Sequence, residues 1–226
     1  MDSTALYTRF RSEMRDEVAP YLWSDLDVYT AMDDAQKMFC RLQGGIQDST
    51  SSITSIAVTA GDTHVSVSPL ILKLRYAYRA SDGITLDILN FEDLQYRRSP
   101  SDYGVVSPMR LDSRTGALTG VVVGMDKNKL RLINIPVENE TINLIVYRLP
   151  LETIDGADQD LEIDEQHHLH LLIWMKHLAH LKQDAETYDR GRSDLFKANF
   201  EAYCEQARLE REKREHKYRA VAYGGY

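Results

Sequence analysis

The sequence is poor in cysteine and in long apolar runs. Its two cysteines, Cys40 and Cys204, lie far apart in helical patterns, and we interpret them as buried free thiols of a protein in a reducing compartment. Residues 1–18 lack the apolar core of a signal peptide. The longest apolar stretches fall far short of the roughly 20 residues that span a bilayer. We therefore expect a soluble chain, made in a cytoplasm and without a membrane partner.

An excess of positive charge is also missing. Lysine and arginine number 27 against 35 aspartate and glutamate residues, for a net charge of −8. This balance argues against tight nucleic-acid binding by the whole surface, although it permits a surface that DNA passes without sticking. The 226 residues are 43% hydrophobic, enough for one large domain or two small ones with a sizeable core.

Catalytic motifs are absent too. The chain has no HExxH, no CxxC, no Gly-Lys-Ser/Thr loop and no nucleophile elbow, and "GVVVGMDKNK" reads as a strand and turn. The alternating charges of "LEREKREHKYR" indicate an ion-paired helix end. Close acidic pairs could only serve a glycosidase if they faced each other across a cleft; they are Asp25/Asp27, Asp33/Asp34, Asp158/Asp160 and Glu162/Asp164. We expect no catalytic, metal-binding or cofactor-binding residue.

The N-terminal part has helical periodicity. A first stripe consists of Tyr7, Phe10, Met14 and Val18, before Pro20. A second helix is predicted to begin at "WSDLD". Ser24 is expected to cap its N-terminus, and Asp27, three residues later, is expected to complete a capping box. Its stripe is Leu26, Tyr29, Met32, Phe39 and Leu42, and Gly44 and Gly45 are predicted to end it.

The period then changes to that of strands. In "PLILKLRYAYRA", residues 70, 72, 74, 76 and 78 are apolar or aromatic and alternate with basic ones, which predicts a half-buried strand. Further strands are predicted in "ITLDILN", "ALTGVVVGM", "KLRLINIPV" and "TINLIVYRLP". Residues 52–150 thus form a β-rich unit, which we expect to be antiparallel and sandwich-like.

Helical periodicity returns after Leu161, with one helix predicted from about Asp164 to Asp184 and another from about Asp189. Between Glu152 and Glu165 there are seven acidic residues and no basic one, which suggests an exposed acidic linker. The predicted fold class is α+β: a helical bundle core, residues 1–50 and 153–215, with an inserted β domain, residues 51–152. Residues 216–226 are predicted to form an extended C-terminal tail.

Five of the seven histidines lie in "EIDEQHHLHLLIWMKHLAH", residues 162–180. On a helix, His170 and His177 point nearly the same way but lie roughly 10 Å apart, too far for one metal ion with ligand distances near ~2 Å. His167 with His170, and His177 with His180, could supply two ligands each at most. Apolar residues occupy most other directions, so we predict a packed helix of the core with polar histidine edges. A pH-sensitive contact stays open as an alternative.

Two stretches carry a family resemblance. "EIDEQHHLHLLIWMKHLAHLKQDAETYDRGRSDLF" and "YTAMDDAQKMFCRLQGGI" resemble the head-to-tail adaptor (connector) proteins of tailed bacteriophages. The chain looks like their larger, tail tubular protein A-like variety, in which a β domain interrupts the helical core. The segment "KQDAETYDRGR" between two helices and the C-terminal "HKYRAVAYGGY" contribute most, and the resemblance covers most of the chain.

The resemblance implies a structural virion protein of the neck, assembled in the host cytoplasm. Such adaptors form a dodecameric ring below the portal protein, extend the channel through which genomic DNA passes without specific binding, and dock the tail nozzle or tail tube protein for genome ejection. No enzyme activity and no cofactor are implied. Two alternatives remain: an adaptor with peptidoglycan hydrolase activity, and a tail or baseplate β module that binds a host or glycan.

Three sets of residues follow as candidates. The C-terminal tail is expected to become ordered when it docks on the portal, through Lys217, Tyr218, Arg219, Val221, Tyr223 and Tyr226. The helical core is expected to contain Phe10, Met14, Tyr29, Phe39, Leu172, Trp174 and Phe200. Acidic residues expected to face the channel, where like charge lets DNA slide, are Asp158, Asp160 and Glu162.

Overall fold

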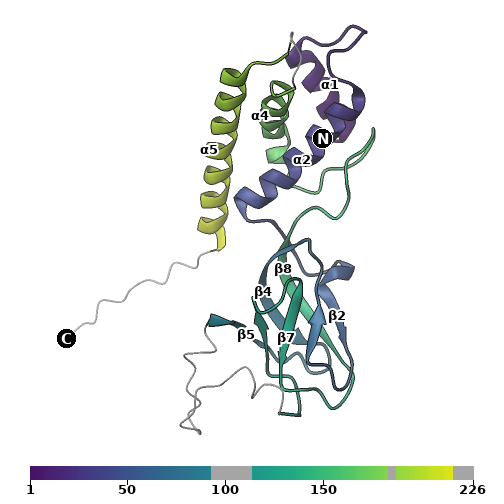
Figure 1. The fold of residues 1–226 in the computed structure, drawn as a ribbon, viewed down its shortest axis with the longest axis vertical. Helices are drawn as coiled ribbons and strands as arrows, with labels where there is room; N and C mark the ends of the chain where they lie inside the picture. The colour runs from purple at the N-terminus through teal and green to yellow at the C-terminus, as the bar shows by residue number, and fades with distance from the viewer. Residues whose placement is uncertain (93–113, 183–186, 216–226) are drawn as a thin grey trace, which may run out of the picture. The chain divides into compact units, whose positions relative to one another are not determined.

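A computed structural model describes residues 1–92, 114–182 and 187–215 (Figure 1). The chain divides into two compact units: Met1–Gly45 with Pro150–Tyr226, and Ile46–Leu149. The described part of the first unit is helical, and the second is built from strands. The protein is therefore of the α+β class, as predicted.

The first helix, α1, spans Ser3–Met14, and the side chain of Asp2 accepts a hydrogen bond from the Ala5 N–H at its start. It ends because Arg15 adopts a left-handed conformation with φ 58°. Val18 is 81% exposed, so its predicted place in the apolar stripe is wrong. The apolar spacing continues in the sequence after Met14, but the helix has already ended there.

Helix α2, Asp25–Gln43, begins with the predicted capping box between Ser24 and Asp27 and ends at Gly44, which has φ 99°. A side chain at position 44 would be strained by that φ and would collide with the guanidinium of Arg211 on α5, Arg190–Glu215. The predicted stripe is wrong at its ends, since Leu26 is 70% exposed and Leu42 is 37% exposed. The face that is buried instead consists of Val28, Met32, Ala35, Gln36, Phe39 and Cys40.

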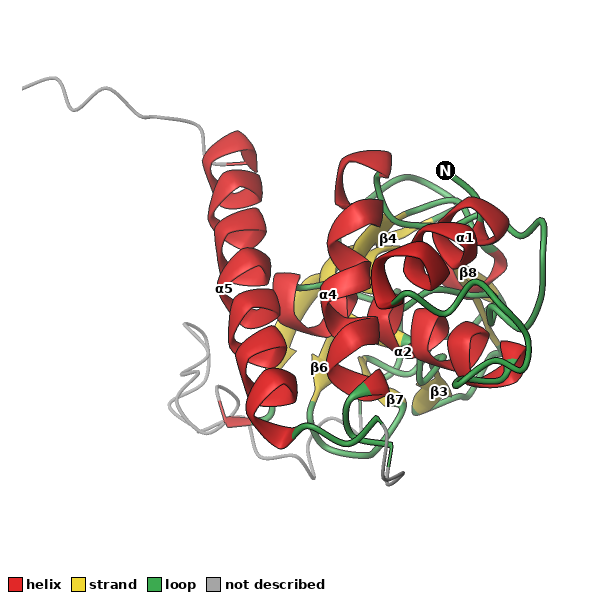
Figure 2. Cartoon of the chain, turned by 90° about the horizontal axis from the view of Figure 1, so that it is seen from above, coloured by secondary structure: helices red, strands yellow, loops and turns green. Residues whose placement is uncertain are grey.

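The second half of the helical unit begins with a 3-10 turn, η3, at Glu165–His167, followed by α4, His168–Ala179, and α5, Arg190–Glu215. The predicted helix to Asp184 is too long, because α4 ends at Ala179. Figure 2 shows α4 lying beside α5, and α4 also contacts α1 and α2. Helix α4 is thus the central element of the bundle.

The described residues of the strand unit form two four-stranded sheets. In the first, β8 (Glu140–Arg148) pairs along one edge with β4 (Ile71–Arg79) and along the other with β1 (Ile46–Asp48) and β2 (Ser55–Val58), which are joined through the 3-10 turn η1 (Ser52–Thr54). The second sheet has the order β3-β7-β6-β5, with strands His64–Ser66, Lys129–Ile133, Gly120–Val123 and Asp87–Asn90. One apolar core joins the inner faces, as in a sandwich.

Two details differ from the predicted antiparallel sandwich. Strands β5 and β6 pair in parallel, while the other pairs are antiparallel. Strand β4 also breaks its predicted alternation: Leu72 and Tyr76 are 41% and 43% exposed, whereas Ala77 is fully buried. The pairing of β4 with β8 shifts register twice, between Ile71 and Lys73 and between Leu74 and Tyr76. Each shift turns the following side chains to the other face.

A buried ion pair lies at the start of the strand unit, between Asp48 of β1 and Arg148 of β8. The Asp48 carboxylate also accepts the Thr50 N–H at 2.9 Å and the Ser51 hydroxyl at 2.5 Å. This carboxylate therefore fixes the turn that follows β1. Strand β1 falls within residues 1–50, which the sequence analysis assigned to the helical core.

Candidate functional site

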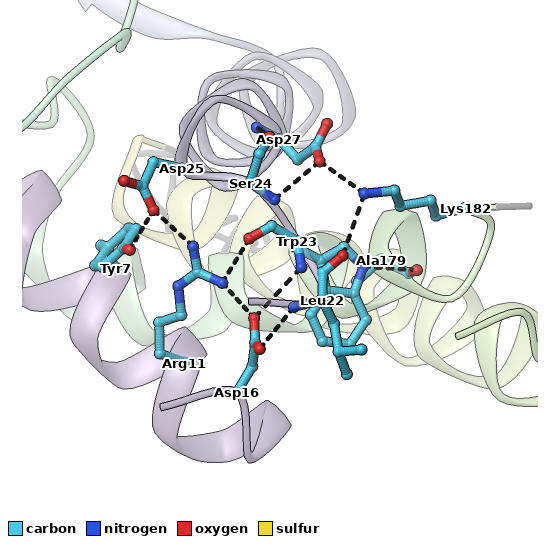
Figure 3. Close-up of polar contacts among 10 residues, drawn as sticks. All are labelled: Tyr7, Arg11, Asp16, Leu22, Trp23, Ser24, Asp25, Asp27, Ala179 and Lys182. Carbon is cyan, nitrogen blue, oxygen red and sulfur yellow. Dashed lines mark hydrogen bonds and ion pairs between the residues drawn. The ribbon is translucent and has the colours of Figure 1, made fainter. Parts of the chain in front are cut away.

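Arg11 on α1 is the centre of a buried polar network (Figure 3). Its guanidinium pairs with Asp16 and donates hydrogen bonds of 2.7 Å to the Trp23 carbonyl and to Asp25. Asp16 also accepts the backbone N–H groups of Leu22 and Trp23. The segment between α1 and α2 is thereby attached to α1, and Arg11 cannot reach a ligand because its side chain is only 5% exposed.

The close acidic pairs of the helical unit have structural partners. Asp27 completes the α2 capping box and accepts a 2.9 Å bond from Lys182. The hydrogen bond from Tyr7, helped by Arg11, lowers the pKa of Asp25. Asp33 pairs with Lys37 within α2, and Asp34 accepts the indole N–H of Trp174 at 2.7 Å, which joins α2 to α4. These carboxylates stabilise the bundle and show no arrangement that a glycosidase would need.

The histidines of α4 form much of its contact with α5. His167 Nδ1 lies 2.8 Å from the Tyr203 hydroxyl, and the His170 ring stacks on the Tyr203 ring with centroids 3.6 Å apart. Further along, Trp174 packs on Phe200 with centroids 5.1 Å apart. Positions 167, 170, 174 and 177 repeat at steps of three, four and three, the spacing of a seam between two helices. We call these four residues and their partners on α5 the histidine seam.

Residues near the start of α5 also contact the histidines. His177 Nδ1 lies 2.7 Å from the Ser193 hydroxyl, which itself donates to the His177 carbonyl at 3.0 Å. His180 stacks on Phe196. His168 does not contact α5 in this way: its Nε2 lies 2.8 Å from the Ile163 carbonyl and so joins α4 to the segment before it. Within the three described ranges, no group of three or more His, Cys, Asp or Glu side chains could hold a metal ion.

The acidic segment before α4 exposes most of its carboxylates, as expected, but it is anchored at three points. Ile154, Leu161 and Ile163 are buried, and they anchor the segment to the helical unit. Glu162, predicted to face the channel, is half-buried and its carboxylate accepts the N–H groups of Leu151 and Glu152. Buried apolar side chains thus hold the segment in place despite its local excess of negative charge.

The other candidate channel residues lie at the surface. Asp158 and Asp160 are both exposed. Asp158 accepts a 3.0 Å hydrogen bond from the Thr4 hydroxyl of α1, and Asp160 forms an isolated β-bridge with Asp2. Both residues therefore contact the start of α1, Asp158 through its carboxylate and Asp160 through its backbone, and both are exposed.

The expected core residues fall into two groups. Five are buried in the helical unit: Phe10, Phe39, Leu172, Trp174 and Phe200. Met14 and Tyr29 are half-buried instead, and the Tyr29 ring stacks on Tyr7 at a centroid distance of 5.3 Å. The Tyr29–Tyr7 stack joins α2 to α1.

A pocket of about 580 Å³ lies among α1, α2 and α4. Its lining is largely apolar and includes Trp23, Leu26 and Leu178, with the Asp27–Lys182 ion pair also among its residues. It brings together no nucleophile with a general base. Its chemistry is that of a contact surface.

The tail residues Lys217, Tyr218, Arg219, Val221, Tyr223 and Tyr226 lie outside the described part of the chain. Of the "KQDAETYDRGR" segment, residues 183–186 also lie outside it. No helix among the described residues is both long and apolar enough to cross a membrane.

Sequence reasoning missed the Arg11–Asp16 pair, the Asp48–Arg148 pair and the stacking of His170 on Tyr203. The last two join positions distant in the chain, which no local spacing reveals. The first joins residues five apart, but Asp16 lies beyond the end of α1, where helical spacing no longer applies.

The chain consists of a helical unit interrupted by a strand unit, and the polar groups described above make internal contacts. Comparison with known families gives the assignment: the family model described as SU10 adaptor protein matches residues 1–222. The chain belongs to this family, and it is thus a phage adaptor, a structural protein of the virion neck. No curated protein sequence matches the chain significantly.

Proposed function

We propose that this adaptor forms a ring below the portal protein, extends the DNA channel and provides the docking surface for the tail nozzle or tail tube. The observation that carries the proposal is the family match over residues 1–222. The ring is expected to be dodecameric, and the protein to be of the larger, tail tubular protein A-like variety. No cofactor is needed for any of these roles.

The surface of the helical unit supports an assembly role. Large apolar side chains remain exposed on it, including Leu26 at 70%, Leu195 at 59% and Leu169 at 51%. Leu195 lies on the face of α5 opposite to Phe200 and Cys204, and these two residues are buried against the bundle. Exposed apolar side chains on several helices suit contacts with further subunits or with the portal.

Imaging tests the ring directly. We expect negative-stain micrographs of the purified chain mixed with portal-containing, DNA-filled heads to show an additional ring-shaped layer below the portal, and heads alone to lack it. The mass of the recovered complex gives the number of adaptor copies. A chain that binds heads without a ring, or fails to bind them at all, would contradict the proposal.

We also propose that Asp158 and Asp160 face the channel. Both are exposed carboxylates, and a wall of the same sign as the phosphates repels DNA enough to let it slide. We expect the chain to show no tight, salt-sensitive binding to duplex DNA. A variant with Asp158→Lys and Asp160→Lys should slow genome ejection from assembled particles, whereas Glu17→Lys and Glu201→Lys, which change exposed acids elsewhere, should not. Equal ejection rates for both variants would count against the assignment.

A further inference from the structure

The histidine seam places titratable rings where two packed helices usually carry apolar residues. His167 is 9% exposed and lies between the Phe39 ring of α2, at a centroid distance of 4.7 Å, and Tyr203 of α5. His170 covers the face of the same Tyr203 ring. Two imidazoles therefore contact one phenol inside a helix interface, where burial disfavours a positive charge on either ring.

The hydrogen bonds of His167 fit the neutral ring, and a second proton would change the contact with Gln166. Its Nε2 lies 3.1 Å from the side-chain nitrogen of Gln166, and its Nδ1 lies 2.8 Å from the Tyr203 hydroxyl. With the amide so oriented, Gln166 donates to Nε2, and Nδ1–H donates to Tyr203. Protonation would put an N–H on Nε2 that faces an N–H donor, so the contact must rearrange.

We propose that the histidine seam is a pH-dependent latch: neutral His167 and His170 hold α5 against α4, and their protonation releases α5 at Tyr203. The released helix leads directly to residue 216 and beyond. The latch would therefore change how the C-terminal segment is presented to a partner. It is a property of the single chain and does not depend on ring formation.

Burial of the seam favours the neutral state of His167 and His170. Burial lowers the pKa of His167, and His170 and Arg214 of α5 lower it further, against the opposite influence of Asp164 and Glu210. Burial also lowers the pKa of His170, more than its bond to the Gln166 backbone raises it.

Other neighbours do not supply a compensating charge. On α5, burial raises the pKa of Tyr203, so its hydroxyl stays neutral, and the adjacent Cys204 thiol stays protonated as well. From α2 the contact is the uncharged Phe39 ring. An imidazolium formed at His167 or His170 would be attracted by the faces of these aromatic rings, but the cost of burying its charge is larger, since the pKa values of both histidines are lowered.

The direction of the pH effect follows from linkage. Because the folded imidazoles have lower pKa values than the unfolded ones, the unfolded or released state binds more protons as the pH falls below about 6.5. The latch is fully closed above that pH. It weakens as the pH falls from there toward the pKa values of the closed state.

Cys204 reports the opening. Its thiol is 1% exposed on the seam side of α5, so it should react with a pyridyl disulfide reagent only when α5 is released. The experiment uses the full chain and measures Cys204 labelling by mass spectrometry, at about pH 7.5 and about pH 5. Each rate is divided by that of glutathione at the same pH, which removes the intrinsic pH dependence of thiols.

We expect the normalised labelling rate of Cys204 to rise severalfold at the lower pH, because protonation of the two imidazoles favours the released state. The far-UV circular dichroism should stay unchanged. A double variant, His167→Asn with His170→Phe, places an amide N–H donor near the former Nδ1 position and keeps an aromatic ring on Tyr203. Neither new side chain titrates, so the labelling rate of Cys204 in this variant should lose its pH dependence. If it does not fold, His170→Phe alone should reduce the dependence.

The matched control is His168→Gln. This histidine is on the same helix and bonds the Ile163 carbonyl, so the variant should keep the full pH dependence. The latch is overturned if the wild-type rate does not change, if the double variant retains the change, or if His168→Gln abolishes it. Loss of far-UV circular dichroism over the same pH range overturns it too, because α5 would then not open separately.

Discussion

The Tyr203 ring of α5 lies flat against the His170 ring of α4, with centroids 3.6 Å apart and planes 4° apart. The phenol hydroxyl meanwhile contacts His167, one turn earlier on the chain. One tyrosine thus engages two histidines that the sequence presents as possible metal ligands. The contact explains why histidines at this spacing belong to a helix interface.

The centre of α4 should contribute strongly to stability. Leu172 is 3% exposed, whereas Leu169 on the same helix is 51% exposed. We expect Leu172→Ala to lower the free energy of unfolding by about 2–5 kcal/mol, because it removes buried methyl groups and leaves a cavity. Leu169→Ala is the matched control and should stay within about 0.5 kcal/mol. Urea denaturation measures both, and equal losses would contradict the packing of α4.

The Arg11 network should be sensitive to the loss of one charge. In Arg11→Met, the Asp16 side chain, which is 2% exposed, is left buried without its cation. We expect a loss of about 3–5 kcal/mol in the free energy of unfolding. Arg9→Met breaks an exposed pair with Glu13 on the same helix and should cost less than about 1 kcal/mol. Chemical denaturation distinguishes them, and a small effect at Arg11 would show that the network contributes little.

Local signals in the sequence predicted the local features of the fold. The capping box of Ser24 and Asp27 and the glycine at 44 were found because each acts within a few residues. The predicted strand runs near Leu89, Val121 and Leu132 were also right. Here the apolar pattern and the turn residues agree with the tertiary structure.

Features that depend on distant partners were not predictable. The two bulges of β4 exist only in its pairing with β8, and the parallel pairing of β5 with β6 depends on sheet topology. The His167–Tyr203 contact spans 36 positions and the Asp48–Arg148 contact spans 100. Periodicity describes one element at a time, so it carries no information about such partners.

The strand unit should have its own acid sensitivity, through Asp48. Burial raises the pKa of this carboxyl, but bonds from Ser51, Thr50 and Arg148 outweigh it and hold the pKa well below its usual range. A depressed folded pKa means stability that is present above the unfolded pKa of about 3.9 and is lost as the pH falls below it.

Asp48→Asn should therefore reduce the free energy of unfolding at neutral pH, by about 3–5 kcal/mol, since Arg148 loses its buried partner. The variant should also show a flatter decline in stability below about pH 4. Asp82→Asn, in the more exposed pair with Arg79, is the control and should cost less than about 1 kcal/mol. Thermal unfolding at several pH values measures this, and parallel pH curves for wild type and Asp48→Asn would refute it.

The C-terminal segment is proposed to dock on the portal. Residues 217–226 carry two basic residues, three tyrosines and no acidic residue. Tyrosines combine a large contact area with a hydrogen-bonding tip, and Lys217 and Arg219 can pair with acidic portal side chains. Contacts of α5 with the bundle are described at earlier residues, including Phe200, Tyr203 and Arg211.

Deleting residues 217–226 should therefore leave the melting temperature nearly unchanged while abolishing attachment to DNA-filled heads. Cosedimentation of the truncated chain with heads measures attachment, and circular dichroism measures the melting temperature. A milder variant, Tyr218→Ala with Tyr223→Ala, should weaken attachment because it removes contact area while keeping the charges. Tyr188→Ala removes an exposed tyrosine next to α5 and should bind heads normally. Truncated protein that joins heads at the normal efficiency would show that docking uses another surface.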